Sequence, residues 1–133
     1  MKELRIKANL EKLDSLIKET NEVLASIPFS NHDKVLINTA LEEVFVNVVK
    51  YAMKSNGEFT YIVDSKDDKA IFTFIDTGEK FNPLEREDPD VTLCGERRSI
   101  GGLGIYMVKK IMDEVHYEYK DNQNILTLVK YIK

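Results

Sequence analysis

A long amphipathic segment between Lys34 and Lys54 constrains the fold of this chain more than any other feature. Its apolar residues recur at the spacing of an α-helix, which predicts a helix with one wide buried arc. The centre of that arc comprises Ile37, Leu41, Val44, Val48 and Ala52. A helix of this kind needs a second layer to cover its apolar side, so the segment indicates a layered globular fold.

Glu43 and Asn47 are two polar residues at the edge of this arc. Residues four apart lie about 40° apart on a helical wheel, so the two side chains project side by side. Taken alone, the pair fits the solvated shoulder of an amphipathic helix. A functional interpretation is also open, because an amide oxygen suits Mg²⁺ and a carboxylate can accept a proton from a hydroxyl group.

The rest of the chain predicts short strands separated by helices and turns. Period-two alternation predicts strands, and helical spacing predicts two further helices. The expected strands are 2–7, 58–64, 70–76, 115–119 and 125–132, and the expected helices are 10–27 and 101–113. Ser30 or Asn31 can cap the long helix, and Gly57 can end it in a left-handed conformation. Hairpin-connected strands with a few helices argue for an α+β fold, a two-layer α/β sandwich whose mostly antiparallel, mixed sheet is covered on one face by helices.

Length and composition favour one cytoplasmic domain that spans residues 1–133. The chain has 133 residues, a net charge of -4 and one cysteine, Cys94. A single cysteine excludes an internal disulfide and fits a reducing compartment. The acidic balance argues against direct nucleic-acid or membrane binding, and no apolar run approaches the length of a membrane span.

Asp76, Thr77 and Gly78 follow the third expected strand. Asp and Gly are common turn residues, so a simple turn is one interpretation. The other is that a partly buried Asp76 accepts a hydrogen bond from a nucleobase amine. In that case Gly78 would let the backbone approach the ring closely.

A glycine-rich segment, 101–104, opens the last expected helix. Backbone N–H groups at a helix start can bind phosphate, although the spacing matches neither the dinucleotide fingerprint nor a P-loop. The polar stretch from Leu84 to Ile100 precedes it and predicts a lid loop of about 17 residues. Arg97 and Arg98 in that loop can reach phosphates, or they can be a solvated basic pair.

Taken in order, these motifs resemble the GHKL superfamily with its Bergerat ATP-binding fold, and within it the anti-sigma factor serine kinases. Residues 41–47 resemble the N box of that family, and residues 74–83 its first glycine box. Residues 101–114 resemble the second glycine box, and residues 124–130 the closing strand. The resemblance spans nearly the whole chain.

The resemblance implies roles for five residues around the base and the phosphates. Asn47 matches the magnesium ligand that bridges the ATP phosphates, and Glu43 matches the general base. Asp76 matches the residue that accepts the adenine amino group, with Gly78 beside it. Thr127 matches a residue that supports this contact through a water molecule.

The resemblance also implies a phosphate-binding set. Gly102 and Gly104 match the phosphate-facing glycines, with Leu103 between them, and Arg97 or Arg98 matches a γ-phosphate contact. Lys80 departs from the family, because many members have a second glycine there. Tyr51 departs as well, because the related kinases often have histidine at that position.

The function that this resemblance implies is an ATP- and Mg²⁺-dependent protein serine kinase. It would phosphorylate a serine on a STAS-domain anti-anti-sigma partner and sequester a sigma factor, and the related kinases often form homodimers. The alternative is a nucleotide-gated binding module without kinase turnover. The catalytic half of a histidine kinase is disfavoured because no helical segment with a phospho-accepting histidine precedes the first strand. Gyrase-like and mismatch-repair-like ATPases are also disfavoured, because they need a further transducing domain and we expect a single domain here.

Overall fold

The computed structural model describes residues 1–85 and 100–132 of the chain. The elements follow one another as β1 (Lys2–Lys7), the 3₁₀ turn η1 (Leu10–Lys12), α1 (Leu13–Leu24), α2 (Asn31–Asn47), the π-helical turn η2 (Val48–Ala52), β2 (Glu58–Lys66), β3 (Lys69–Asp76), the 3₁₀ turn η3 (Pro83–Glu85), α3 (Ile100–Ile111), β4 (Glu114–Lys120) and β5 (Gln123–Tyr131). The predicted succession of strands and helices is therefore confirmed in these residues.

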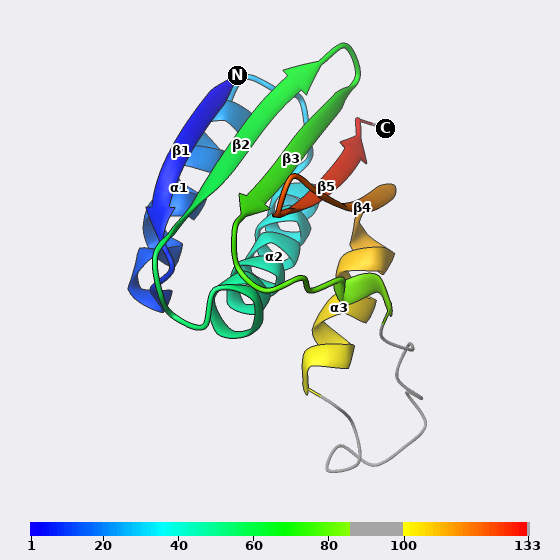
Figure 1. The fold of residues 1–133 in the computed structure, drawn as a ribbon. Helices are drawn as coiled ribbons and strands as arrows, with labels where there is room; N and C mark the ends of the chain where they lie inside the picture. The colour runs from blue at the N-terminus through cyan, green and yellow to red at the C-terminus, as the bar shows by residue number, and fades with distance from the viewer. Residues whose placement is uncertain (86–99, 133) are drawn as a thin grey trace.

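The strands form one five-stranded sheet in the order β1-β2-β3-β5-β4. Every pairing between neighbouring strands of the sheet is antiparallel. Helices α1, α2 and α3 lie on one face of the sheet, and no helix within residues 1–85 and 100–132 covers the other face (Figure 1). This is the predicted α+β, two-layer arrangement, with an antiparallel sheet throughout.

The core lies between α2 and the inward face of the sheet. All five residues at the centre of the predicted helical arc are at most 7% exposed. Alternate residues of β2 and β3 face them, and these include Phe59, Tyr61, Phe72 and Phe74, each at most 1% exposed. Fully burying a large apolar side chain contributes about 1.5–3 kcal/mol, so this layer contact dominates the stability of the fold.

The long helix begins and ends in ways that the sequence predicted only in part. Ser30 Oγ accepts a hydrogen bond of 3.0 Å from Asp33 N, so Ser30, and not Asn31, is the N-cap. The α-helix ends at Asn47 and continues as the single π-turn η2. In this turn Met53 N donates to Val48 O at 2.8 Å, five residues back. Such π-turns occur frequently at functional sites.

Other boundaries differ from the predictions by a few residues. α1 ends at Leu24, before the predicted Ile27, which is nevertheless buried. The reversal after η2 begins at Lys54 and Ser55, whose φ angles are 52° and 59°, and Gly57 adopts a φ of 80° two residues later. The left-handed turn therefore starts earlier than a glycine-based prediction places it.

The predicted lid between Leu84 and Ile100 lies mostly outside the described residues, which include only its two ends. Cys94 also lies outside the described residues. Within residues 1–85 and 100–132, no helix has the length and apolar character needed to cross a lipid bilayer.

Ser30→Ala should lower the free energy of unfolding by about 1 kcal/mol, because it removes the side-chain acceptor at the start of α2. Ser30→Asp is the matched control, since a carboxylate can accept the same hydrogen bond and is favourable at a helix N-terminus. Urea denaturation of both variants measures the difference. Equal losses in the two variants would contradict the capping role.

Candidate functional site

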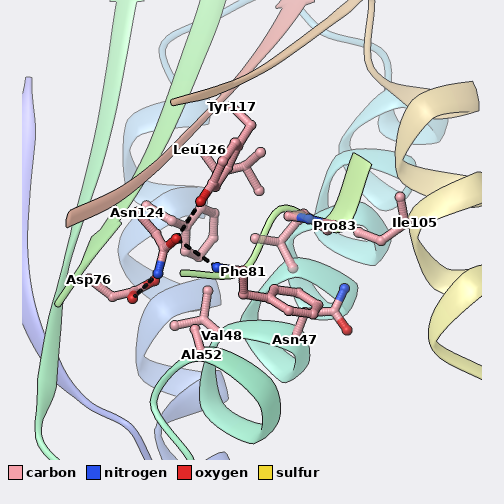
Figure 2. A pocket seen from close by; sticks show the side chains of 12 residues that line it. Asn47, Val48, Ala52, Asp76, Phe81, Pro83, Ile105, Tyr117, Asn124 and Leu126 are labelled. Carbon is pink, nitrogen blue, oxygen red and sulfur yellow. Dashed lines mark hydrogen bonds between the residues drawn. The ribbon is translucent and has the colours of Figure 1, made fainter. Parts of the chain in front are cut away.

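A pocket opens where the end of α2 meets the sheet and α3. It encloses about 330 Å³ of empty space, part of which is open to solvent. Its lining is mostly apolar and comprises Val44, Asn47, Val48, Ala52, Phe74, Asp76, Phe81, Pro83, Ile105, Tyr117, Asn124 and Leu126. Apolar walls with a few convergent polar groups are typical of a small-molecule site (Figure 2).

Asp76 is the buried charge of this pocket. It ends β3 on the inward face of the sheet and is only 4% exposed. Its Oδ1 atom accepts hydrogen bonds from Gly78 N and Asn124 Nδ2, both at 2.9 Å. Its second oxygen, Oδ2, receives no hydrogen bond from the described residues, which leaves an acceptor for a ligand donor. Burial raises the pKa of the Asp76 carboxyl, and the two hydrogen bonds partly offset that rise.

Asn124 is a site residue that the sequence analysis missed. It lies directly opposite Asp76 in the β3–β5 pairing and is 4% exposed. Its amide nitrogen donates to Asp76 Oδ1 and to Glu79 O at 2.7 Å, and its Oδ1 accepts from Phe81 N at 3.0 Å and from the Tyr117 hydroxyl at 2.5 Å. Asn124 thereby fixes both the carboxylate and the loop that follows it (Figure 2).

Thr127, which the resemblance implied at the base, does not reach this pocket. It pairs with Thr73 on β3 and His116 on β4, one residue out of phase with the inward-facing Asn124, Leu126 and Leu128. Successive side chains of a strand point to opposite faces, so Thr127 lies on the uncovered face of the sheet. The assignment of Thr127 to the nucleotide is therefore corrected, and Asn124 is the β5 residue at this position.

Gly78 is required for packing against η2. A Cβ atom at this position would lie 2.1 Å from the carbonyl oxygen of Ala52, which is backbone and cannot move aside cheaply. The next residue, Glu79, donates its backbone N–H to the same oxygen at 3.0 Å. The loop after Asp76 is thus tied to η2, immediately after Asn47 in the chain.

Asn47 is the polar group at the other end of the pocket. Its side chain is 7% exposed, and no described residue hydrogen-bonds its amide. In Figure 2 it lies beside Phe81, opposite the Asp76–Asn124 pair. No cluster of three or more His, Cys, Asp or Glu side chains in residues 1–85 and 100–132 could hold a metal ion by itself. A single amide oxygen fits Mg²⁺, because this ion keeps several waters and is commonly shared with substrate phosphates.

Glu43 lies one helical turn before Asn47 and contacts the start of α3. A Cβ atom at Gly104 would come within 2.3 Å of Glu43 Oε2, so the absence of a side chain at Gly104 makes room for this carboxylate. Ile105, the neighbour of Gly104, lines the pocket. Partial burial, and secondly the charge of Glu42, raise the pKa of Glu43, which makes it a stronger base than an exposed glutamate.

The remaining predicted phosphate contacts are described only in part. Gly102 and Leu103 belong to the first turn of α3, which begins at Ile100. The backbone N–H group of Gly102, the third residue of the helix, is among those without an intrahelical acceptor. Arg97 and Arg98 lie outside the described residues. The site therefore brings together Glu43, Asn47, Asp76 and Gly104 from three segments of the chain.

The two departures from the family pattern take local roles. The Tyr51 ring stacks on Phe81, with centroids 5.6 Å apart and planes inclined by 19°. Lys80 places its ammonium group 5.5 Å from the centre of the Tyr119 ring. Stacking on Phe81 makes Tyr51 a support for one wall of the pocket.

Comparison with known families agrees with this geometry. Residues 6–130 match the model of the histidine kinase-like ATPase domain. The chain therefore belongs to the family of histidine kinase-like ATPase domains.

Individual relatives point to a more specific class of protein within this family. A serine-protein kinase RsbW from Staphylococcus epidermidis is 30% identical over 140 residues, which covers 98% of this chain and 86% of the relative. A serine-protein kinase RsbW from Staphylococcus aureus strain JH9 is 28% identical over 144 residues, with the same coverage of both chains. The predicted likeness to the anti-sigma factor serine kinases is confirmed, and the chain is a kinase-type, ATP-using domain.

A solved structure shows the same fold. The crystal structure of the RsbU and RsbW domains of Rv1364c from Mycobacterium tuberculosis matches with a TM-score of 0.66 at 18% sequence identity. The match covers 98% of this chain and 32% of that one, so this chain spans about a third of its length.

Asp76→Asn should abolish ATP binding while it raises the free energy of unfolding at neutral pH. The folded-state pKa of Asp76 is raised, so the ionised carboxylate destabilises the fold at a pH above that value. This cost disappears once the pH falls below the ordinary aspartate pKa, and the gap between the variant and the wild type should then close. Urea denaturation across this pH range and calorimetric ATP titration measure both effects. A wild type more stable than the variant at neutral pH would contradict the argument.

Asn124→Ala should lower the free energy of unfolding by about 2–4 kcal/mol and weaken ATP binding by about tenfold or more, because four hydrogen bonds around Asp76 and its loop are lost. Thr127→Ala is the matched control on the same strand, and ATP affinity should be unchanged in it. Chemical denaturation and ATP titration separate the two variants. A comparable loss of affinity in Thr127→Ala would refute the assignment of these residues to opposite faces.

Proposed function

We propose that this chain is an ATP- and Mg²⁺-dependent protein serine kinase of the anti-sigma factor type. The observation that carries the proposal is the position of Glu43. It is a partly buried carboxylate with a raised pKa that lies against Gly104, beside the pocket that contains Asp76 and Asn47. A domain that only bound nucleotide would need the pocket but not this base.

The pocket supports a defined orientation of ATP. Asp76 Oδ2 would accept a hydrogen bond from the adenine amino group, between apolar walls that include Phe74 and Leu126. The phosphates would then extend past Asn47 toward the first turn of α3. Backbone N–H groups there, together with Gly102 and Gly104, would face the negative charge.

The chemistry assigned to Glu43 is proton transfer. A serine hydroxyl of a protein substrate would attack the γ-phosphorus, its oxygen would bond to the phosphoryl group, and ADP would leave with the electrons of the broken P–O bond. Glu43 would accept the hydroxyl proton, and its raised pKa favours that step. Catalysis of this kind rests mainly on positioning and charge neutralisation.

Asn47 is the residue that would hold Mg²⁺. The ion, when bound, supplies charge neutralisation between the phosphates. Arg97 and Arg98 are proposed as further γ-phosphate contacts from the loop.

The proposed substrate is a serine of a STAS-domain anti-anti-sigma protein, and the proposed sequestered partner is a sigma factor. The names of the relatives support this at the level of the kinase, since those proteins are serine-protein kinases RsbW. The proposed location is the cytoplasm, where a sigma factor would be sequestered. A nucleotide-gated module without turnover is the competing function, and the next experiment separates the two.

Glu43→Gln should lower the rate of phosphate transfer to the partner serine by about 10²-fold or more. Mg²⁺–ATP should still raise the melting temperature of this variant. Glu42→Gln is the matched control, because its side chain is exposed and should retain most activity. Phosphoserine formation on STAS-domain proteins encoded near this one gives the rate, and thermal denaturation reports ATP binding.

Two results would decide against the proposal. ATP binding without transfer to any tested STAS-domain protein would favour the binding module. No thermal shift at millimolar ATP would instead remove the nucleotide site itself.

A further inference from the structure

The direction of the hydrogen bonds around Asp76 is fixed by the backbone of the loop that follows β3. Three backbone groups of this loop take part, the N–H groups of Gly78 and Phe81 and the carbonyl of Glu79. A backbone N–H can only donate a hydrogen bond, and a carbonyl can only accept one. The loop therefore imposes a donor or an acceptor on each side-chain atom that it contacts.

The loop first orients the amide of Asn124. Asn124 Oδ1 lies 3.0 Å from Phe81 N, and Asn124 Nδ2 lies 2.7 Å from Glu79 O. Turning the amide by 180° would set its nitrogen against an N–H group and its oxygen against a carbonyl, so both bonds would be lost. The Tyr117 hydroxyl donates to the same Oδ1 in the observed orientation (Figure 2). The Asn124 nitrogen is therefore a fixed donor toward Asp76.

These donors in turn orient Asp76. Its Oδ1 atom faces Gly78 N and Asn124 Nδ2, both at 2.9 Å. Because both groups are fixed donors, the Oδ1 position must hold an atom that accepts hydrogen bonds. The Oδ2 position carries no such requirement, since no described residue hydrogen-bonds it. The atom at the Oδ2 position thus decides whether residue 76 offers a bound base an acceptor or a donor.

Purine bases differ in the group that would meet this atom. Adenine carries an amino group at C6, which donates, whereas hypoxanthine and guanine carry an oxygen at C6, which accepts. An ionised Asp76 offers only acceptors. A protonated Asp76 must carry its proton on Oδ2, because Oδ1 faces two N–H groups, and it then offers a donor to the C6 oxygen.

We propose that the outer atom of residue 76 selects the purine base: ionised Asp76 binds 6-aminopurine nucleotides, whereas Asp76 with a proton on Oδ2 binds 6-oxopurine nucleotides. This inference rests on the proposed function, which sets the base against Asp76. An amide at residue 76 reproduces the second state without a change of pH. Its oxygen must occupy the Oδ1 position, so its nitrogen is directed to the bound base as a donor.

The protonated state of Asp76 is accessible because the carboxyl is buried. Asp76 is only 4% exposed, and this burial raises the pKa of its carboxyl. Asp76 therefore gains its proton at a higher pH than an exposed aspartate does.

Other titratable groups leave this equilibrium to Asp76. The titratable side chains around the loop are Tyr51, Lys54, Glu79, Lys80, Tyr117 and Tyr119. Lys54 and Glu79 pair with each other at 2.9 Å, and both side chains are more than 60% exposed. The Tyr117 hydroxyl bonds Asn124. Within residues 1–85 and 100–132, none of the six side chains forms a hydrogen bond or ion pair with Asp76.

Binding of ATP and of ITP, whose base is hypoxanthine, tests the selection at neutral pH. The wild type should bind Mg²⁺–ATP at least about tenfold more tightly than Mg²⁺–ITP, because the C6 oxygen of ITP would face an acceptor. Asp76→Asn should reverse the preference by a similar factor. Asp76→Ala is the matched control, since it offers neither donor nor acceptor and should lose the preference in both directions. Calorimetric titration measures each affinity.

Lowering the pH should move the wild type in the same direction as the amide substitution. The ratio of ITP affinity to ATP affinity should rise by about tenfold or more as the pH falls through the pKa of Asp76. The ratio should change less in Asp76→Asn, whose amide does not titrate. Titration of the phosphates cancels in this ratio, because the two nucleotides share them.

Circular dichroism establishes that each variant is folded. A wild type that binds ITP as tightly as ATP at neutral pH overturns the inference. A folded Asp76→Asn that still prefers ATP, or that binds neither nucleotide, overturns it as well. In each of these cases ATP binding by the wild type leaves the proposed kinase function standing. A wild type that binds neither nucleotide overturns the proposed function and this inference together.

Discussion

Burial of α2 against the antiparallel sheet is the contact on which the rest of this structure depends. Its inward residues are almost completely inaccessible and meet the aromatic side chains of β2 and β3. The same contact fixes the rotation of the helix about its axis. That rotation leaves Asn47 at the border of the core and Glu43 beside the start of α3.

The pocket beside α2 is built around a carboxylate that is unfavourable to bury. Asp76 is desolvated and no cationic partner neutralises it among the described residues; the hydrogen bonds from Gly78 and Asn124 compensate only in part. A fold selected for stability alone would place an apolar side chain there. The next inward-facing pair on the same two strands, Phe74 and Leu126, is apolar. A ligand that brings its own hydrogen-bond donor would offset this energetic cost.

Local patterns predicted most of the fold and part of the site. Alternation placed the strands, and helical spacing placed α2 with Glu43 and Asn47 on its edge. The π-turn left no comparable signal in the sequence, because no single residue type specifies such a turn. Asn124 carried a signal, since a polar residue occupies an inward position in line with Leu126 and Leu128. Its meaning depends on the register that sets it opposite Asp76. Register is non-local, and the family resemblance implies Thr127 instead.

The attachment of the Asp76 loop to Ala52 has a consequence for sequence divergence. Glu79 N bonds the Ala52 carbonyl, and Gly78 lies against the same atom, so main-chain atoms hold this end of the loop. Side chains at 79 and 80 are then free to vary, provided that residue 79 keeps its N–H and residue 78 has no Cβ. This accounts for Lys80 at the position where the family pattern has a second glycine. A loop held by its backbone can change its surface chemistry without moving the buried carboxylate of Asp76.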